Sequence, residues 1–330
     1  MIDTKIEYKV LFLSSRDFPR PHLVSSKCIE FESCRYNGLI IRSSLVKKLK
    51  NYVNFTPICP EVEIGLGIPR EPIHLEKDQD KIELIQPSTG YNCTSKMSEF
   101  ADSFLTSVEG VDGFILKNKS PSCGVKAVKV YPKGGMSRPW TDGVGLFAAA
   151  VFRCFSFTPV EDEGRLRNYH LRENFLTRIY TLADFRENVL NGDFRDLLDF
   201  HTKNKLLFSS YSQIHSRKLG RLVSNLRETT YPELVEKYGN TMKKMLRNDP
   251  LPPANINVLM HAFGHFSDYL SHSEKAFFLE SLEKYRQGRV PLLVNQDLLK
   301  SWIIRFDNEY LADQTFFEPY PEELMEITFI

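Results

Sequence analysis

Short apolar runs alternate with amphipathic stretches in the first half of the chain, and this alternation predicts strands and helices in turn. The stretch that begins at Thr94 carries apolar side chains at the spacing of one buried helix face. Strands that alternate with helices are typical of a parallel sheet, so we expect a Rossmann-like α/β fold here. The expected strands are residues 23–24, 54–58, 111–116 and 127–131, with a hairpin of 73–75 and 82–85, and the other expected helices are residues 43–52 and 144–155.

The second half has a different pattern. From residue 168 onward, helical periodicity continues through almost the whole chain, and strand signals are almost absent. We therefore expect two domains, an α/β domain at residues 1–165 and a mostly α-helical domain at residues 166–330. The polar segment 161–164 is the expected joint between them.

Composition excludes several classes of protein. The chain has 330 residues, of which 42% are hydrophobic and 26% charged, and these ordinary values exclude a fibrous or largely disordered chain. No run of about 18 apolar residues is present to span a bilayer, and the N-terminal stretch does not resemble a secretory signal. Six cysteines are too few for a disulfide scaffold of this size. These features predict a cytoplasmic protein with reduced thiols.

Three cysteines closely follow predicted strands. Cys28, Cys59 and Cys123 each lie within a few residues of a strand's carboxyl end, the edge at which open parallel sheets bind ligands. Three converging thiolates could hold a metal ion or an iron–sulfur cluster. Against this, no Cys-x-x-Cys pair is present, and a free cysteine is more commonly a small buried hydrophobic residue. Cys34 is a candidate for a spare thiol near the same place.

Three segments of the first half resemble the thiouracil desulfidase (TudS-like) family. They are residues 26–38 (SKCIEFESCRYNG), 59–72 (CPEVEIGLGIPREP) and 120–124 (SPSCG). The resemblance extends over roughly residues 20–165, whereas the residues before it have no assigned role.

The second half resembles the YbgA-like helical domain that often follows a TudS-like domain. The segments that carry this likeness are residues 200–207, 219–222 and 285–292. The fused form is similar to RudS-type desulfidases, which are implicated in removing sulfur from 4-thiouridine in transfer RNA. The expected partner is therefore a thiolated tRNA or thionucleotide.

The resemblance implies a [4Fe-4S] cluster held by Cys28, Cys59 and Cys123, with one iron that has no protein ligand. An open iron can act as a Lewis acid on a soft thiocarbonyl sulfur. Water would then add to the ring carbon, and the products would be uridine and hydrosulfide without net redox chemistry. If Cys34 were a fourth ligand, this catalytic interpretation would be weakened.

Water addition and C–S cleavage need proton transfers, so a general acid or base is expected near the cluster. Glu61, two residues after Cys59, is the first candidate to activate water, and Ser120 or Ser122 could position or relay a proton. The structural alternatives are a carboxylate that fixes its loop and hydroxyls that cap a turn.

Further side chains near the cysteines are candidates for contacts with a nucleotide. Arg35, Tyr36 and Asn37 either bind substrate or form the tight turn that Asn37 and Gly38 predict. Asn37 stands where stand-alone members of the family commonly have Asp. The lysines that could meet a phosphate are Lys27, Lys117 and Lys119.

Charge is unevenly distributed in the second half. Residues 201–222 carry five basic and no acidic side chains, whereas seven acidic and no basic residues follow Arg305. The basic residues are Lys203, Lys205, Arg217, Lys218 and Arg221, and the aromatic rings interleaved with them are His201, Phe208, Tyr211 and His215. A basic stripe with exposed rings could bind RNA through phosphate contacts and base stacking. The alternative is a solvated helix face that the acidic tail neutralises.

Other functions stay open at this point. The enzyme could act on a free thiouracil or a thionucleotide rather than on tRNA. The chain could instead be a non-catalytic iron–sulfur or zinc RNA-binding module, or a zinc- or thiol-dependent hydrolase. His261 and His265 share a helix face and could bind a metal, although a packed pair is the simpler interpretation.

Overall fold

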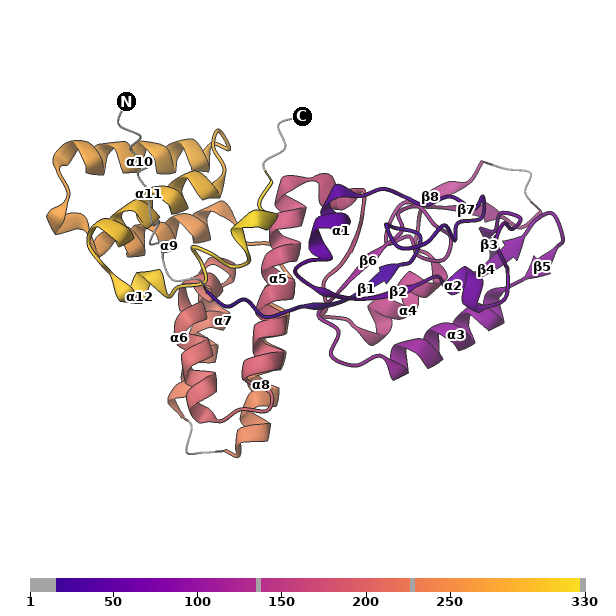
Figure 1. Ribbon diagram of the computed structural model, residues 1–330, viewed down its shortest axis with the longest axis horizontal. Helices are drawn as coiled ribbons and strands as arrows, with labels where there is room; N and C mark the ends of the chain where they lie inside the picture. Colours follow the sequence, from indigo (N-terminus) through magenta and orange to yellow (C-terminus); the bar gives the residue numbers. More distant parts are fainter. Residues whose placement is uncertain (1–15, 135–137, 226–228, 327–330) are drawn as a thin grey trace, which may run out of the picture.

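The computed structural model describes residues 16–134, 138–225 and 229–326. Residues 1–15, which include most of the N-terminal stretch without an assigned role, lie outside the described residues. A part that contains the sheets and an all-helical part lie side by side, with one long helix between them (Figure 1). No helix among the described residues is long and apolar enough to cross a membrane.

Four parallel strands form the central sheet of the first half. They are β1 (His22–Ser26), β2 (Asn54–Ile58), β6 (Gly113–Leu116) and β9 (Val160–Asp162), in the order β2-β1-β6-β9. All of β6 and all but the first residue of β1 are buried, as expected for a parallel sheet that is covered on both faces. The prediction of an α/β parallel-sheet domain followed by a mostly helical one is confirmed.

A second sheet of five strands lies beside the first and was not predicted. Its strands are β3 (His74–Asp78), β4 (Lys81–Gln86), β5 (Tyr91–Asn92), β7 (Val128–Pro132) and β8 (Trp140–Gly143), in the order β5-β4-β3-β7-β8. The β3–β4 hairpin is confirmed. The strand expected at residues 127–131 belongs to this sheet and not to the parallel one, because Val130 pairs with Leu75.

The polar segment 161–164 is not a free joint. Glu161 and Asp162 form the end of β9, and the Asp162 side chain is buried. Its Oδ1 accepts hydrogen bonds from the backbone N–H groups of Gly164 and Arg165, at 2.9 and 2.8 Å. A buried carboxylate that satisfies backbone donors fixes the turn by which the chain leaves the sheet, so the expected joint is a structured turn.

Helices cover both faces of the central sheet. On one face lie α3 (Thr94–Ser107) and α4 (Leu146–Cys154), which share a core with both sheets. On the other face lie α1 (Ser44–Leu49) and α5 (Tyr169–Asn188). The short helix α2 (Pro60–Glu63) follows β2 directly.

The remaining helices build the second half around two apolar cores. They are α6 (Phe194–Tyr211), α7 (Gln213–Ser224), α8 (Tyr231–Leu246), α9 (Pro252–Gly264), α10 (His272–Arg286), α11 (Leu292–Arg305) and α12 (Glu309–Ala312), with short 3₁₀ turns at Arg165–Arg167, Ser267–Tyr269 and Glu322–Leu324.

The two halves share one core, because α5 packs directly against the parallel sheet. Phe175 and Ile179 of α5 belong to the same buried cluster as Leu23 of β1 and Ile115 of β6. The close approach depends on Gly113, where a Cβ atom would lie 2.7 Å from Ile179 Cγ2 and 3.0 Å from Leu23 Cδ2. The helical half is therefore held on the sheet by core packing.

Replacing Gly113 by Ala should lower the free energy of unfolding by about 1–3 kcal/mol, because the added methyl group overpacks this contact. Urea unfolding measures the loss. Gly264→Ala, at the end of α9 with nothing within 4 Å of the added Cβ, is the matched control and should be neutral or slightly stabilising. Equal effects of the two substitutions would contradict the packing argument.

Candidate functional site

A cavity of 280 Å³ lies at the carboxyl ends of β1, β2 and β6. Because these strands are parallel neighbours, the segments that follow them meet at one edge of the sheet. The cavity is lined by Cys28 and Cys34 after β1, by Cys59 and Glu61 after β2, and by residues 117–121 and Cys123 after β6.

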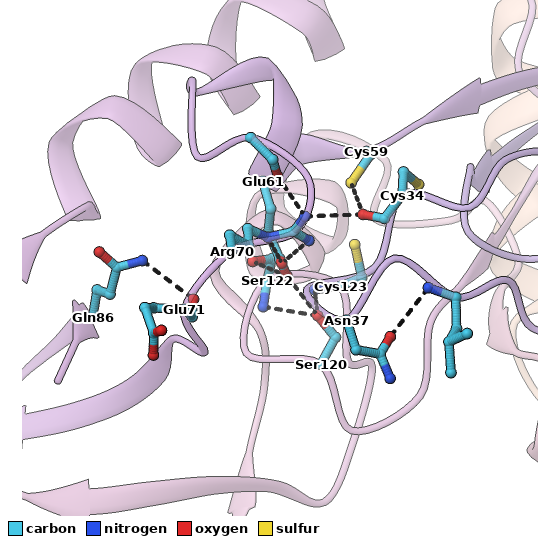
Figure 2. A network of polar contacts seen from close by, with 12 residues as sticks. Cys34, Asn37, Cys59, Glu61, Arg70, Glu71, Gln86, Ser120, Ser122 and Cys123 are labelled. Carbon is cyan, nitrogen blue, oxygen red and sulfur yellow. Dashed lines mark hydrogen bonds and ion pairs between the residues drawn. The ribbon is translucent and has the colours of Figure 1, made fainter. Parts of the chain in front are cut away.

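Four thiols line this cavity, and all four side chains are buried. The Cys59 thiol donates a hydrogen bond to the Cys34 carbonyl oxygen at 3.8 Å, and Figure 2 shows the sulfur atoms of Cys34, Cys59 and Cys123 in the same region. Of the other two cysteines, Cys93 is buried in the core beside α3 and Cys154 is exposed.

Hydrogen bonding and burial raise the pKa of three of the thiols, those of Cys34, Cys59 and Cys123. A hydrogen bond with Cys28, together with burial, raises the pKa of Cys34 to about 11. A hydrogen bond with Cys34 raises the pKa of Cys59, and burial raises that of Cys123. A metal group that binds here must therefore displace protons from these thiols.

Thiols predominate among the possible metal ligands that line the cavity. No three His, Cys, Asp or Glu side chains in the described part of the chain lie close enough together to hold one metal ion. The thiols instead surround a shared cavity, and thiolate sulfur is the ligand that iron–sulfur clusters use. Cys34 lies with the other three, so it is positioned as an additional thiol.

The loop that carries Cys123 is fixed by the start of α4. The backbone N–H groups of Gly145, Leu146 and Ala148 donate to the carbonyl oxygens of Gly124, Pro121 and Ser122 at 2.8–3.1 Å. These contacts satisfy N–H groups that every helix leaves open at its N-terminus. A Cβ at position 145 would lie 2.5 Å from the Ser122 carbonyl, so only glycine permits the approach.

Glu61 connects two walls of the cavity (Figure 2). Its Oε1 accepts hydrogen bonds from the Ser122 hydroxyl at 3.0 Å and from the Ser120 hydroxyl at 3.3 Å. Ser120 Oγ also accepts from the backbone N–H groups of Ser122 and Cys123, at 3.2 and 3.1 Å. The three side chains predicted to move protons thus form one hydrogen-bonded group, in which Ser120 also caps the turn.

Arg70 completes this group, and sequence reasoning assigned it no role. Its side chain is 3% exposed, and its Nε donates to Glu61 Oε2 at 3.0 Å. Its Nη1 donates to the carbonyl oxygen of Cys34 at 2.9 Å, and its backbone N–H donates to that of Tyr36 at 2.8 Å. Arg70 therefore ties the loop after β1 to the loop after β2. The only available signal was its place in the 59–72 segment.

The other candidates near the cysteines are divided between the cavity and its surroundings. Arg35 and Tyr36 line the cavity, and the Arg35 guanidinium lies 5.5 Å from the centre of the Tyr36 ring. Asn37 does not line the cavity. Its side chain accepts a hydrogen bond from Leu39 N at 3.2 Å, which matches the role of forming a turn rather than that of binding substrate.

The lysines are divided in the same way. Lys27 lies outside the cavity lining and pairs with Glu32 at 2.5 Å, whereas Lys117 lines it and pairs with Glu163 at 2.6 Å. Lys119 also lines the cavity, and no ion pair to it is present among the described residues.

The five basic residues of the predicted stripe lie on α6 and α7, and Figure 1 shows these helices away from strands β1, β2 and β6. Four of them, Lys205, Arg217, Lys218 and Arg221, are exposed, whereas Lys203 pairs with Asp199 at 2.7 Å.

Two of the four rings that were expected to be exposed, those of Phe208 and His201, are not exposed. Phe208 is fully buried in the core with α8, and His201 bonds to the Tyr238 hydroxyl at 2.9 Å. Burial lowers the pKa of His201 to about 4. Phe208 and His201 face the helix packed on α6 and cannot stack on RNA bases, so the expectation of a stacking surface is wrong for them.

The two histidines at the end of α9 are exposed and contact other rings. The rings of His261 and His265 lie 5.8 Å apart, and His265 stacks on Tyr310. Among the described residues, no third His, Cys, Asp or Glu completes a metal site with them.

Two family models match the chain, one in each half. Residues 23–163 match the family described as 2-thiouracil desulfurase, and residues 205–321 match one described as a protein of unknown function (DUF1722). The chain is 30% identical over 109 residues to the uncharacterized protein YbbK of Bacillus subtilis (strain 168), covering 31% of this chain and 72% of that protein. The chain belongs to the 2-thiouracil desulfurase family.

The chain has a second relative. It is 28% identical over 151 residues to the uncharacterized protein YbgA of Escherichia coli (strain K12), covering 45% of this chain and 89% of that protein. Among solved structures, the [4Fe-4S]-dependent thiouracil desulfidase TudS aligns at 25% identity with a TM-score of 0.36, over 45% of this chain and 94% of that one. The resemblance expected for both halves of this desulfurase-family chain is confirmed.

Replacing Arg70 by Met should cost about 3–5 kcal/mol of unfolding free energy, because the Glu61 carboxylate then stays buried without its cation. Adding Glu61→Gln should recover part of this loss. Urea unfolding of the metal-free protein measures both. Arg165→Met, which breaks the more exposed pair with Glu161, is the control and should cost about 1 kcal/mol or less. A loss in the Arg70 variant no larger than in this control would contradict the structural role.

Proposed function

We propose that the protein is a [4Fe-4S]-dependent desulfidase that removes sulfur from a thiolated uracil, with 4-thiouridine in tRNA as the preferred substrate. One observation carries the proposal. In a 2-thiouracil desulfurase-family domain, the cysteines after three parallel strands line one cavity together with Glu61 and Ser120, and Ser122 is hydrogen-bonded to Glu61 behind them. All six cysteines are free thiols, which suits the reducing cytoplasm.

The residues that would hold the cluster are Cys28, Cys59 and Cys123. When bound by three thiolates, such a cluster supplies an iron without a protein ligand, which acts as a Lewis acid toward a thiocarbonyl sulfur. The uracil base would bind in the same cavity. Tyr36 and Arg35 line this cavity and offer an aromatic ring and a planar cation beside the base.

The proton transfers fall to Glu61 and the serines. Overall, water replaces sulfur at the ring carbon, and both protons of the water end on the released sulfur. The Glu61 carboxylate takes the first proton from the attacking water. Ser120, which lines the cavity and whose hydroxyl donates to Glu61 Oε1 at 3.3 Å, would pass the proton of the water to the carboxylate. Ser122, whose hydroxyl donates to the same oxygen at 3.0 Å, is the second candidate for a relay. Arg70 keeps the carboxylate oriented through Oε2, so that Oε1 faces the two serine hydroxyls.

A second candidate function follows from Cys34. A fourth buried thiol in the cavity favours a closed cluster that only stabilises the fold, in a non-catalytic RNA-binding module. Turnover separates this candidate from the desulfidase.

Sulfide release from thiolated tRNA by anaerobic, cluster-loaded protein tests the desulfidase directly. Glu61→Gln should bind the cluster as the wild type does, shown by iron content and absorbance, and lose about 10²–10⁴ in kcat. Cys123→Ala should lose both the cluster and activity. The controls are Glu63→Gln, an exposed neighbour on α2, and Cys154→Ala. A fully loaded wild type that releases no sulfide but binds RNA tightly would instead establish the binding module.

The exposed basic residues of α6 and α7 should carry the tRNA phosphate contacts. Changing Lys205, Arg217, Lys218 and Arg221 to Gln together should weaken tRNA binding and reduce the slope of log K against log salt by about 3. Lys243→Gln with Lys244→Gln, exposed on α8, serves as the control. An unchanged salt slope in the fourfold variant would exclude this surface.

A further inference from the structure

A cavity of 650 Å³ lies in the helical half and shares no lining residue with the cavity of the thiols, which has less than half its volume. Its walls come from the first half of α5, the end of α6, the start of α9, the segment between α10 and α11, and the segment after α12. In Figure 1, α9, α10 and α11 lie on the side of α5 that faces away from the sheets. The desulfidase chemistry gives this cavity no role.

The segment 285–292, which carries part of the likeness of the second half to YbgA-like domains, lines this cavity with seven of its eight residues. It leads from the last turn of α10 to the first residue of α11, and Gly288 has a φ of +70°, in the left-handed region that favours glycine. The tight reversal at Gly288 places side chains from both sides of the turn on one cavity. A binding role would explain this segment, which the basic surface of α6 and α7 does not involve.

Three tyrosine rings line the cavity beside apolar side chains. The Tyr211 hydroxyl donates to Asn174 Oδ1 at 2.6 Å, and the Tyr285 hydroxyl accepts from Asn255 Nδ2 at 2.8 Å. The third ring is that of Tyr169, and the apolar lining includes Leu207, Val290, Leu292 and Phe316. Aromatic and apolar walls with a few fixed polar groups, around a volume of this size, are typical of a site for a small organic ligand.

Two buried acceptors in these walls lack a hydrogen-bond partner among the residues that the structure describes. They are Glu173 Oε1 and Asn255 Oδ1. Glu173 also forms no salt bridge within the described ranges, and burial raises its pKa against the opposite effects of Arg172 and two tyrosines. Asp249, the other acid of the lining, instead accepts from Asn174 Nδ2. Because a buried acceptor without a donor is unfavourable, a ligand that brings N–H groups would be stabilised here.

Two exposed arginines also line the cavity. Arg286 pairs with Glu283 at 3.1 Å, whereas Arg289 forms no salt bridge in the part of the chain that the structure describes. A guanidinium group binds a phosphate through paired N–H donors. The lining thus combines buried acceptors, aromatic rings and an available cation.

We propose that this cavity binds a free guanine nucleotide. Among the four bases of RNA, only guanine presents two adjacent N–H donors on one edge, N1–H and the 2-amino group, and a carboxylate can accept both side by side. Glu173 accepts these two donors, the tyrosine rings contact the base, and Arg289 binds the phosphate. The site is separate from the thiols, and its occupation does not depend on the desulfidase reaction.

Calorimetry with the whole chain and guanosine 5′-monophosphate tests the site. The wild type should bind this nucleotide about tenfold more tightly than adenosine or uridine 5′-monophosphate, because only guanine offers the paired donors. Arg289→Gln should weaken binding of the monophosphate and leave that of guanosine unchanged. Equal affinity of the wild type for the three monophosphates would overturn the proposal.

A change of specificity tests the role of Glu173 itself. In Glu173→Gln the side-chain amide offers one acceptor and one donor. It should weaken binding of guanosine 5′-monophosphate about tenfold and strengthen that of xanthosine 5′-monophosphate, in which a carbonyl oxygen replaces the 2-amino group. A gain of affinity cannot come from misfolding. Glu187→Gln, exposed on the same helix and outside the cavity lining, is the matched control and should bind both nucleotides as the wild type does.

Two further results would contradict the assignment. Weaker binding of guanosine 5′-monophosphate by Glu173→Gln without stronger binding of xanthosine 5′-monophosphate would exclude the pairing of Glu173 with the base. Binding of tRNA that requires Glu173, without any binding of the free monophosphate, would overturn the proposal in favour of a guanosine of RNA. Sulfide release is measured separately, so failure of the desulfidase and failure of this site are distinguishable.

Discussion

The parallel pairing of β1 with both of its neighbours is the constraint on which the rest of the site depends. Strands that run the same way end at the same edge, so three chain segments far apart in sequence must leave the sheet together. Had β2 or β6 been antiparallel to β1, Cys59 or Cys123 would lie at the opposite end of the sheet from Cys28. The hydrogen-bond ladder of the backbone, rather than any contact between the cysteines, therefore brings the thiols to one cavity.

Once the segments meet, polar contacts join the walls of the cavity to one another. Glu61 joins the second loop to the third, and Arg70 joins the first to the second. Burying a carboxylate is unfavourable unless hydrogen bonds replace those it made to water, and the guanidinium and two hydroxyls do so here. The same bonds orient the carboxylate, so the groups that build the cavity are also those available to move protons in it.

Features with a local signal could be predicted from the sequence. The strand ends before the three cysteines, the buried face of α3 and the β3–β4 hairpin all follow from periodicity within about 15 residues. The second sheet could not be predicted, because it depends on the pairing of Leu75 with Val130. Arg70 was missed for a similar reason: whether an arginine is exposed or buried against a carboxylate is decided by the fold around it.

The aromatic residues of α6 show a second limit of prediction from the sequence. Basic and aromatic positions along one helix suggest a binding face, but the pattern alone does not say which rings a neighbouring helix covers. Packing of α8 buries Phe208, whereas Lys205, Arg217, Lys218 and Arg221 stay exposed. The exposed basic side chains can attract phosphates but provide less surface for base stacking. Any recognition of bases would therefore fall mainly to the thiol cavity.

The cavity and the helical half are coupled through one carboxylate. Glu163 follows β9 and precedes α5, and it binds both the Lys117 ammonium and the Asn118 backbone N–H in the wall that carries Lys119 and Ser120. α5 in turn is packed on the sheet through Gly113. The helical half and the cavity wall are thus joined by the ion pair of Glu163 with Lys117 and by a helix packed on the sheet, rather than by a flexible linker.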